Sequence, residues 1–145
     1  MSARLLFVCQ GNTCRSLIAE FIARELCGKM IESTSAGFEP QKVGDAANAI
    51  DCLKDHFGID ASTHVPKDVG LLDVKVYDYV IVMDRRIAIR FKGKYPAYPD
   101  ERLIRWKIKD PWGNVDEYKP CALSIIKELR RLRSKIVGPS NSSRG

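Results

Sequence analysis

The sequence predicts a three-layer α/β/α protein whose small parallel sheet, of about four strands, has helices on both faces. Two observations predict this fold. Short apolar runs typical of buried strands alternate with longer stretches in which apolar residues recur at helical spacing. The chain has 145 residues, 45% of them hydrophobic, which suits one domain with its own core. We expect one domain over 1–139 and a disordered polar tail over 140–145.

The first half of the chain is predicted to form two strand–helix units. In order, the elements are a strand at 5–8, a helix at 15–27, a strand at 31–35 and a helix at 46–57. Gly28 and Gly58 follow the two helices and are typical of helix ends. The second half continues the alternation. It reads as a short helix at 68–74, a strand at 76–83, a basic helix to about 92, a strand at 103–108 and an amphipathic helix over 122–136, stopped near Gly138-Pro139.

Ligands of parallel sheets bind beyond the carboxyl ends of the strands, where loops lead into helices. Here that place holds Cys9 and Arg15, with five residues between them, on the turn between the first strand and the first helix. Such a loop can wrap a tetrahedral oxyanion with inward backbone N–H groups, and Gly11 and Asn12 tolerate the unusual dihedral angles of this nest. The helix N-terminus favours an anion, and arginine can bind two phosphate oxygens at once.

The same field stabilises a cysteine thiolate, because cysteines near helix N-termini and cations ionise more readily. We therefore expect Cys9 to be a nucleophilic anion at neutral pH, with Ser16 donating a hydrogen bond to it. The alternative is a buried strand cysteine beside a solvent-facing arginine. The other members of the predicted phosphate-binding loop are Gln10, Gly11, Asn12, Thr13 and Cys14.

Composition argues against several other classes of protein. The five cysteines include no Cys-x-x-Cys pair, and only His56 and His64 could assist them, so we expect neither a metal site nor a disulfide framework, and no cofactor. The apolar run at 5–8 is too short for a signal peptide or a membrane span. We therefore expect a protein of the reducing cytoplasm, without a membrane partner.

The formal net charge of +6 favours anionic partners. The basic residues gather in two clusters, Arg85, Arg86, Arg90, Lys92 and Lys94, and Lys127, Arg130, Arg131, Arg133 and Lys135. We interpret both mainly as solvated helix faces, with steering of phosphorylated substrates and weak nucleic-acid binding as alternatives. Phe91 is the one aromatic residue within either cluster, which is too few for a stacking platform, so we expect no nucleic-acid partner.

The segment from Cys9 to Ser16, followed by Ile18-Ala19-Glu20, resembles the active-site loop of low-molecular-weight protein tyrosine phosphatases. Thioredoxin-coupled arsenate reductases share that fold and loop. The resemblance covers nearly the whole chain. Its other carriers are Ser35-Ala36-Gly37, His64 with Lys67, Asp78 to Ile81 with Met83-Asp84, and Asp110-Pro111-Trp112.

This resemblance implies roles for residues that spacing alone leaves open. Asp110 matches the general acid and base, although Asp-Pro-x-Gly is also an ordinary turn and Asp84 and Asp116 are nearby alternatives. Trp112 matches the cleft wall, or else is a packed surface aromatic. Further matches are Asn12, Ser35 and His64 in a network that braces the loop, and Cys14 as the partner of a reversible disulfide with Cys9. Taken alone, His64 and Cys14 could equally be packing residues.

The implied activity is hydrolysis of phosphate monoesters, with a phosphorylated protein or a small aryl phosphate as substrate. Leu17, Gln41 and Gly113 depart from the phosphatase pattern, and they make a preference for tyrosine less secure than the chemistry. The first alternative is an arsenate reductase that uses an external thiol reductant, because residues 76–95 contain no cysteine and Met83 stands where one is expected. The second is a catalytically silent phosphate-binding module.

Overall fold

The computed structural model describes residues 2–137, so the predicted helix stop at Gly138-Pro139 and the predicted tail lie outside the described residues. Four parallel strands form the sheet, in the order β2-β1-β3-β4. They are β1 (Ala3–Cys9), β2 (Ile31–Gly37), β3 (Tyr79–Val82) and β4 (Leu103–Arg105). The α-helices are α1 (Arg15–Cys27), α2 (Ala47–Phe57), α3 (Arg85–Lys94) and α4 (Tyr118–Val137).

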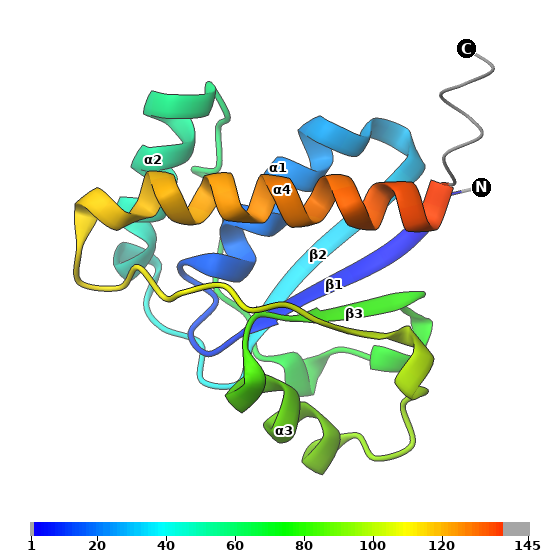
Figure 1. Cartoon of the computed structure of the whole chain (residues 1–145). Coiled ribbons are helices and arrows are strands. Elements are labelled where there is room, and N and C mark those ends of the chain that lie inside the picture. Colours follow the sequence, from blue (N-terminus) through cyan, green and yellow to red (C-terminus); the bar gives the residue numbers. More distant parts are fainter. Residues whose placement is uncertain (1, 138–145) are drawn as a thin grey trace, which may run out of the picture.

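The sheet is covered on both faces, as predicted. Figure 1 shows α1, α2 and α4 on one side of the strands and α3 on the other. Strand side chains alternate between the two faces. Leu5 and Phe7 accordingly join the core beneath α1, α2 and α4, whereas Leu6 and Val8 join the core that packs on α3. The α/β prediction is confirmed.

Element boundaries differ from the predictions where aspartates intervene. The helix predicted at 68–74 is instead two 3₁₀ turns, Val69–Leu71 and Val74–Val76. Asp68 and Asp73 cap these turns by accepting backbone N–H groups two residues ahead, which competes with a continuous helix. The strand predicted from residue 76 therefore begins only at Tyr79.

The strand predicted at 103–108 is β4, which ends at Arg105, yet the chain stays extended beyond it. Trp106 N–H donates to the Val82 carbonyl oxygen and Ile108 N–H donates to that of Met83, both at 2.9 Å. The segment that follows β4 therefore runs along the end of β3 toward the carboxyl edge of the sheet. The loops after β1, β3 and β4 meet at that edge, which positions the site described next.

Within residues 2–137, none of the helices combines the length and the apolar character that crossing a membrane requires.

Candidate active site

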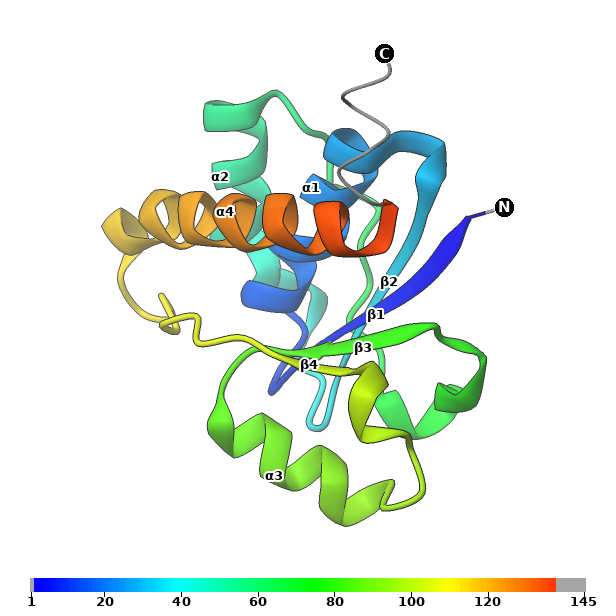
Figure 2. The same ribbon diagram turned by 45° about the vertical axis from the view of Figure 1, so that its right-hand side comes forward.

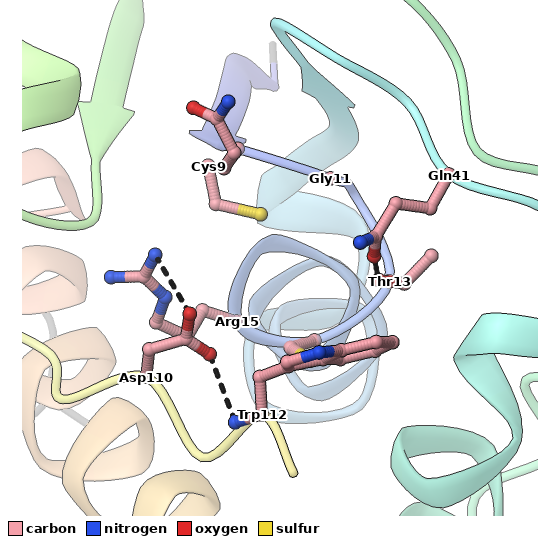
Figure 3. A pocket seen from close by; sticks show the side chains of 9 residues that line it. Cys9, Gly11, Thr13, Arg15, Gln41, Asp110 and Trp112 are labelled. Carbon is pink, nitrogen blue, oxygen red and sulfur yellow. Dashed lines mark hydrogen bonds and ion pairs between the residues drawn. The ribbon is translucent and has the colours of Figure 1, made fainter.

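The loop from Cys9 to Arg15 joins the end of β1 to the start of α1, and both residues are buried. Figure 3 shows their side chains facing one pocket, which Asp110 and Trp112 border from the other side. This cavity of about 100 Å³ is lined by Cys9, Gln10, Gly11, Thr13, Cys14, Arg15, Gln41, Asp110 and Trp112. The first backbone N–H groups of α1 have no side-chain cap at Cys14. The predicted nucleophile, arginine and acid therefore share one small cavity.

Arg15 makes its side-chain hydrogen bonds through only one of its three nitrogens within residues 2–137. Its Nη1 donates to Asp84 Oδ2 at 2.8 Å and to the Ile108 carbonyl oxygen at 3.0 Å. Its Nε is buried and has no hydrogen-bond partner within residues 2–137. Its Nη2 lies 3.9 Å from Asp110 Oδ2. A buried guanidinium N–H without an acceptor is costly, so this group is suited to an anion that enters the loop.

The Cys9 thiol has a hydrogen-bond donor beside it. Cys9 Sγ lies 2.9 Å from Ser16 Oγ. Asn12 Nδ2 donates to the same Ser16 oxygen at 2.9 Å, so the Ser16 hydroxyl proton is available to the sulfur. A thiolate can only accept hydrogen bonds, so a thiolate at Cys9 would have the Ser16 hydroxyl as its donor.

Asn12 fixes the loop backbone. Its φ of 57° is left-handed, and it is the one non-glycine residue with positive φ within the described chain. Its side chain donates to Ser16 and Ser35 and accepts the Lys67 backbone N–H at 3.0 Å. Both N–H donors and the oxygen of the buried amide therefore have partners, and these bonds offset the cost of the left-handed conformation.

Gly11 has a different role from the one predicted, because it does not adopt positive φ. A Cβ at this position would lie 2.6 Å from Gln41 Oε1. Gln41 packs closely over the loop, its N–H donating to the Gly11 carbonyl oxygen and its Oε1 accepting from the Thr13 hydroxyl. The glycine therefore permits close approach and does not supply an unusual dihedral angle.

Ser35 and His64 lie behind the loop, in the same hydrogen-bond network as Asn12. Ser35 accepts from Asn12 and donates to buried Glu20, which pairs with Arg24. His64 Nε2 is 2.7 Å from the Asn12 carbonyl oxygen, so Nε2 carries the proton. Burial lowers the pKa of His64, although that hydrogen bond acts in the opposite direction. The histidine is therefore neutral near pH 7.

Gln10 and Cys14 direct their side chains to neighbours of the loop. Gln10 bonds to Glu39 and to Arg90 of α3, which are themselves paired at 2.8 Å. Cys14 Sγ lies 3.3 Å from the Tyr118 hydroxyl. Burial raises the pKa of the Cys14 thiol to about 11, against the hydrogen bond with Tyr118. Cys14 is therefore a thiol at neutral pH.

The opposite rim of the pocket is more open. Asp110 Oδ1 accepts the Trp112 backbone N–H at 3.0 Å, which closes a turn after Pro111. About half of each side chain is exposed, 51% for Asp110 and 47% for Trp112. Gly113 follows with φ of 85°, a conformation that favours glycine. The carboxylate and the indole therefore face the pocket from a solvated loop.

Asp84, one of the alternative acids, lies between Arg15 and the start of α3. It caps α3 by accepting the Ile87 N–H at 2.9 Å, and its second oxygen accepts from Arg15. Burial alone would raise the pKa of Asp84, but the hydrogen bonds from Arg15 and from the Ile87 backbone outweigh it and hold this pKa below its usual value. Asp84 therefore orients the arginine and stays ionised.

Two residues of the site received no role from the sequence. Glu20 anchors Ser35, and the signal for it is a carboxylate within an otherwise apolar, buried helix stretch. Gln41 was recognised only as a departure from the phosphatase pattern, although its side chain lines the pocket. Within the described residues, no three His, Cys, Asp or Glu side chains gather in a way that could hold a metal ion.

The fold and the loop define a class: parallel α/β proteins with a cysteine–arginine loop after the first strand. Comparisons with known proteins narrow this class. The family model described as low molecular weight phosphotyrosine protein phosphatase matches residues 4–138. The human protein of that name is 34% identical, over 90% of this chain and 94% of its own length. The chain belongs to this family, which confirms the resemblance seen in the sequence.

Relatives with two activities lie near this chain. The solved structure of a low molecular weight protein tyrosine phosphatase from T. tengcongensis is 32% identical, with a TM-score of 0.82, over 92% of this chain and 99% of its own length. A glutaredoxin arsenate reductase from Synechocystis sp. is 35% identical over 92% of this chain and 98% of its own length. Phosphatase and arsenate reductase are thus the two activities that these relatives represent.

Proposed function

We propose that this protein hydrolyses phosphate monoesters, with phosphotyrosine of a protein or a small aryl phosphate as substrate. Residues 1–139 form the single catalytic domain in this proposal, and the enzyme works in the cytoplasm without a metal or cofactor. The observation that carries the proposal is the buried, unpartnered Nε of Arg15 in a loop that also presents the Cys9 thiol. A dianionic phosphoryl group matches both the positive charge and the planar donor geometry of the Arg15 guanidinium.

The first chemical step transfers the phosphoryl group to the enzyme. Cys9 Sγ, as a thiolate, attacks phosphorus, and the bond from phosphorus to the ester oxygen breaks. Asp110 gives its proton to the departing oxygen, because an alkoxide or phenolate leaves poorly. Arg15 and the loop N–H groups bind the equatorial oxygens, whose charge they stabilise in the transition state. The product of this step is a phosphocysteine.

The second step releases phosphate. Asp110, now ionised, accepts a proton from a water molecule that attacks the phosphocysteine. The bond between sulfur and phosphorus breaks, inorganic phosphate leaves, and Cys9 returns as a thiolate. The Ser16 hydroxyl, 2.9 Å from the sulfur, makes that thiolate a better leaving group.

Asp110 is the acid in this proposal because of where the three candidate carboxylates lie. Asp110 lines the pocket and is half exposed, so it can exchange protons with solvent. Asp84 is occupied by Arg15 and by the cap of α3. Asp116 is an exposed residue of a 3₁₀ turn and does not line the pocket.

Arsenate reduction is the second candidate, favoured by the 35% identity to the cyanobacterial glutaredoxin arsenate reductase. Here the Cys9 thiolate would bond to arsenic with loss of water. A second thiol would then attack the Cys9 sulfur, forming a disulfide and releasing arsenite with the two electrons. An external thiol reductant would supply that group, since no cysteine stands in the 76–95 segment.

The test measures both activities on one purified sample. We expect turnover of an aryl phosphate by the wild type, and loss by about 10⁴-fold or more in Cys9→Ser, with phosphate binding retained. Arsenate consumption with glutathione and glutaredoxin is assayed in parallel. Faster thiol-dependent reduction of arsenate than hydrolysis of any aryl phosphate would replace the first proposal by the second. Substantial hydrolysis by Cys9→Ser would reject Cys9 as the nucleophile.

A further inference from the structure

A groove with a volume of about 530 Å³ lies along the edge of the sheet, separate from the candidate active-site pocket. We call it the edge groove. Its walls are Arg85, Ala88, Ile89 and Lys92 of α3 and the segment Arg105, Trp106 and Lys107 after β4. The four α3 residues recur at positions i, i+3, i+4 and i+7, so they form one stripe of the helix. The proposed reaction uses none of these residues.

The groove lies where the sheet is open. β4 is the last strand in the order β2-β1-β3-β4, and Figure 2 shows it at the margin of the sheet, with α3 below. The backbone N–H groups of Trp106 and Ile108 both point to the β3 side, where they donate to carbonyl oxygens. In an extended chain the intervening residue faces the opposite way, so the Lys107 N–H faces the free edge. An extended peptide can pair with such an edge.

The floor of the edge groove is apolar. Trp106 is buried and fixed by its packing on Phe7, with ring centroids 5.8 Å apart, so it offers a rigid wall. Ala88, which lines the same groove, is also buried, whereas 63% of Ile89 is exposed. A large apolar side chain of a partner would cover Ile89 and remove that surface from water.

The rim of the edge groove is cationic, with four basic side chains. Two of them share one acid, since Asp100 pairs with Lys92 at 3.8 Å and with Arg105 at 2.9 Å. Arg85 and Lys107 have no acidic partner within residues 2–137 and are exposed. The groove thus has an excess of positive charge around an apolar floor. Its complement is an anionic segment that carries an apolar side chain.

We propose that the edge groove binds an extended acidic segment of a polypeptide, with one bulky apolar side chain seated against Ile89 and Trp106. Carboxylates of the segment pair with Arg85 and Lys107, and its backbone pairs with the free edge after β4. Nucleic acid fits less well, because it has no backbone N–H and C=O groups to pair with the free edge and no bulky apolar side chain to cover Ile89.

The position of the edge groove beside the candidate active site suggests which protein carries the acidic segment. Arg85 directly follows Asp84, which holds the catalytic-site arginine, so an occupant of the groove begins near the pocket. The acidic segment then belongs to the phosphorylated protein substrate and lowers its KM. This second part rests on the proposed phosphatase function, whereas the binding itself does not.

The binding test uses a labelled, unphosphorylated peptide with Glu and Asp residues around a central Phe, followed by fluorescence anisotropy. We expect the wild-type protein to bind it, and Lys107→Glu or Ile89→Gln to weaken binding about tenfold. The matched control is Lys127→Glu on α4, an exposed residue with the same charge change on the other face of the sheet, which we expect to alter binding less than about twofold. Thermal unfolding of each variant verifies that it is folded.

Three outcomes would overturn the proposal. They are equal binding of a peptide with Lys in place of Glu and Asp, equal weakening by Lys107→Glu and Lys127→Glu, and displacement of the peptide by a single-stranded oligonucleotide at lower concentration than by unlabelled peptide. Each would show that the groove does not select an acidic polypeptide.

Kinetics test the second part separately. We expect Lys107→Glu to raise KM for a phosphotyrosyl peptide with an acidic flank about tenfold, with kcat and the hydrolysis of a small aryl phosphate unchanged. An unchanged KM for that peptide would reject the role in substrate binding. Absence of aryl phosphate hydrolysis in the wild type would instead reject the phosphatase function. The anisotropy measurement would still show whether the edge groove binds an acidic peptide.

Discussion

The two sides of the candidate pocket are built in opposite ways. The loop from Cys9 to Ser16 is buried and is braced from behind by hydrogen bonds of Asn12, Ser35 and His64 to other parts of the protein. The segment with Asp110 and Trp112 is solvated, and its main local bond is the Asx turn between these two residues. One side is preorganised by packing and the other is set by a short turn.

This difference separates two tasks. An oxyanion is stabilised best by dipoles that need no reorganisation, so the loop that would bind the phosphoryl group must be rigid. A proton donor must reach different leaving groups and exchange with water, so an open turn suits it. Changes in the buried loop should therefore affect all substrates alike, whereas changes in the open segment should depend on the leaving group.

Asp110→Asn is expected to have the largest effect in the open segment. Activity on phosphotyrosine should fall about 10²–10⁴-fold because the leaving oxygen is no longer protonated. The loss should be much smaller for a phenol ester whose leaving group is strongly acidic. A series of aryl phosphates of graded leaving-group pKa measures this, with Asp116→Asn as the control. A wild-type slope in Asp110→Asn together with a steeper slope in Asp84→Asn would assign the acid to Asp84.

Arg15→Lys should lower activity about 10²–10³-fold on every member of the same series, because lysine keeps the charge but cannot bind two oxygens from a fixed fork. The control is Arg130→Lys on the exposed face of α4. A loss that varied with the leaving group would contradict the division of tasks between the two sides.

Asn12→Ala tests the bracing of the buried loop. It removes hydrogen bonds to Ser16, Ser35 and Lys67 and places alanine at φ of 57°, so the free energy of unfolding should fall by roughly 3 kcal/mol. Urea denaturation measures this. Asn12→Gly loses the same hydrogen bonds without the backbone strain, and should be the more stable variant of the two. Equal stabilities would show that the left-handed conformation costs little here.

Trp112→Ala should have a modest effect that depends on the substrate. Stacking on an aryl group contributes about 0.5–1.5 kcal/mol, so KM for phosphotyrosine should rise about two- to tenfold. KM for an alkyl phosphate should stay near the wild-type value. Steady-state kinetics on the two substrates measure the ratio, and an equal rise for both would mean that the indole shapes the pocket without stacking.

The smallest effect concerns Cys14. Cys14→Ala and the wild type should have nearly equal activity when reduced, and should differ only after treatment with peroxide. Peroxide converts the Cys9 thiolate to a sulfenic acid, and Cys14 condenses with it to a disulfide with release of water. Burial holds the pKa of Cys14 at about 11, and the thiolate is the attacking form, so disulfide formation should accelerate from pH 7 to pH 9.

The measurement is mass spectrometry of the oxidised protein, with the fraction of activity that reductant restores. Cys14→Ala should recover a smaller fraction than the wild type. Detection of Cys9 sulfonic acid alone at both pH values would contradict a protective role for Cys14.

Local sequence patterns predicted most of the fold and the centre of the site. Residues 15–27 and 47–57 form helices where the apolar spacing and the following glycines place them, and the strand preceding Cys9 is an apolar run. The loop from Cys9 to Arg15 could be predicted in the same way, because both of its end residues lie in one short segment of the sequence. Where prediction was wrong, at 68–74, short-range capping by aspartates overrode the apolar pattern.

The sequence by itself thus determined the strand–loop–helix unit, because nearest neighbours along the chain dictate it. Only the tertiary structure decided that Asp84, 69 residues from Arg15, binds the guanidinium and that Asp110 lies half-exposed at the rim. It also decided that α3 and the segment after β4 enclose a basic groove. Both depend on the strand order β2-β1-β3-β4, which brings distant carboxyl ends to one edge. Strand order follows from packing over the whole chain, which no local pattern encodes.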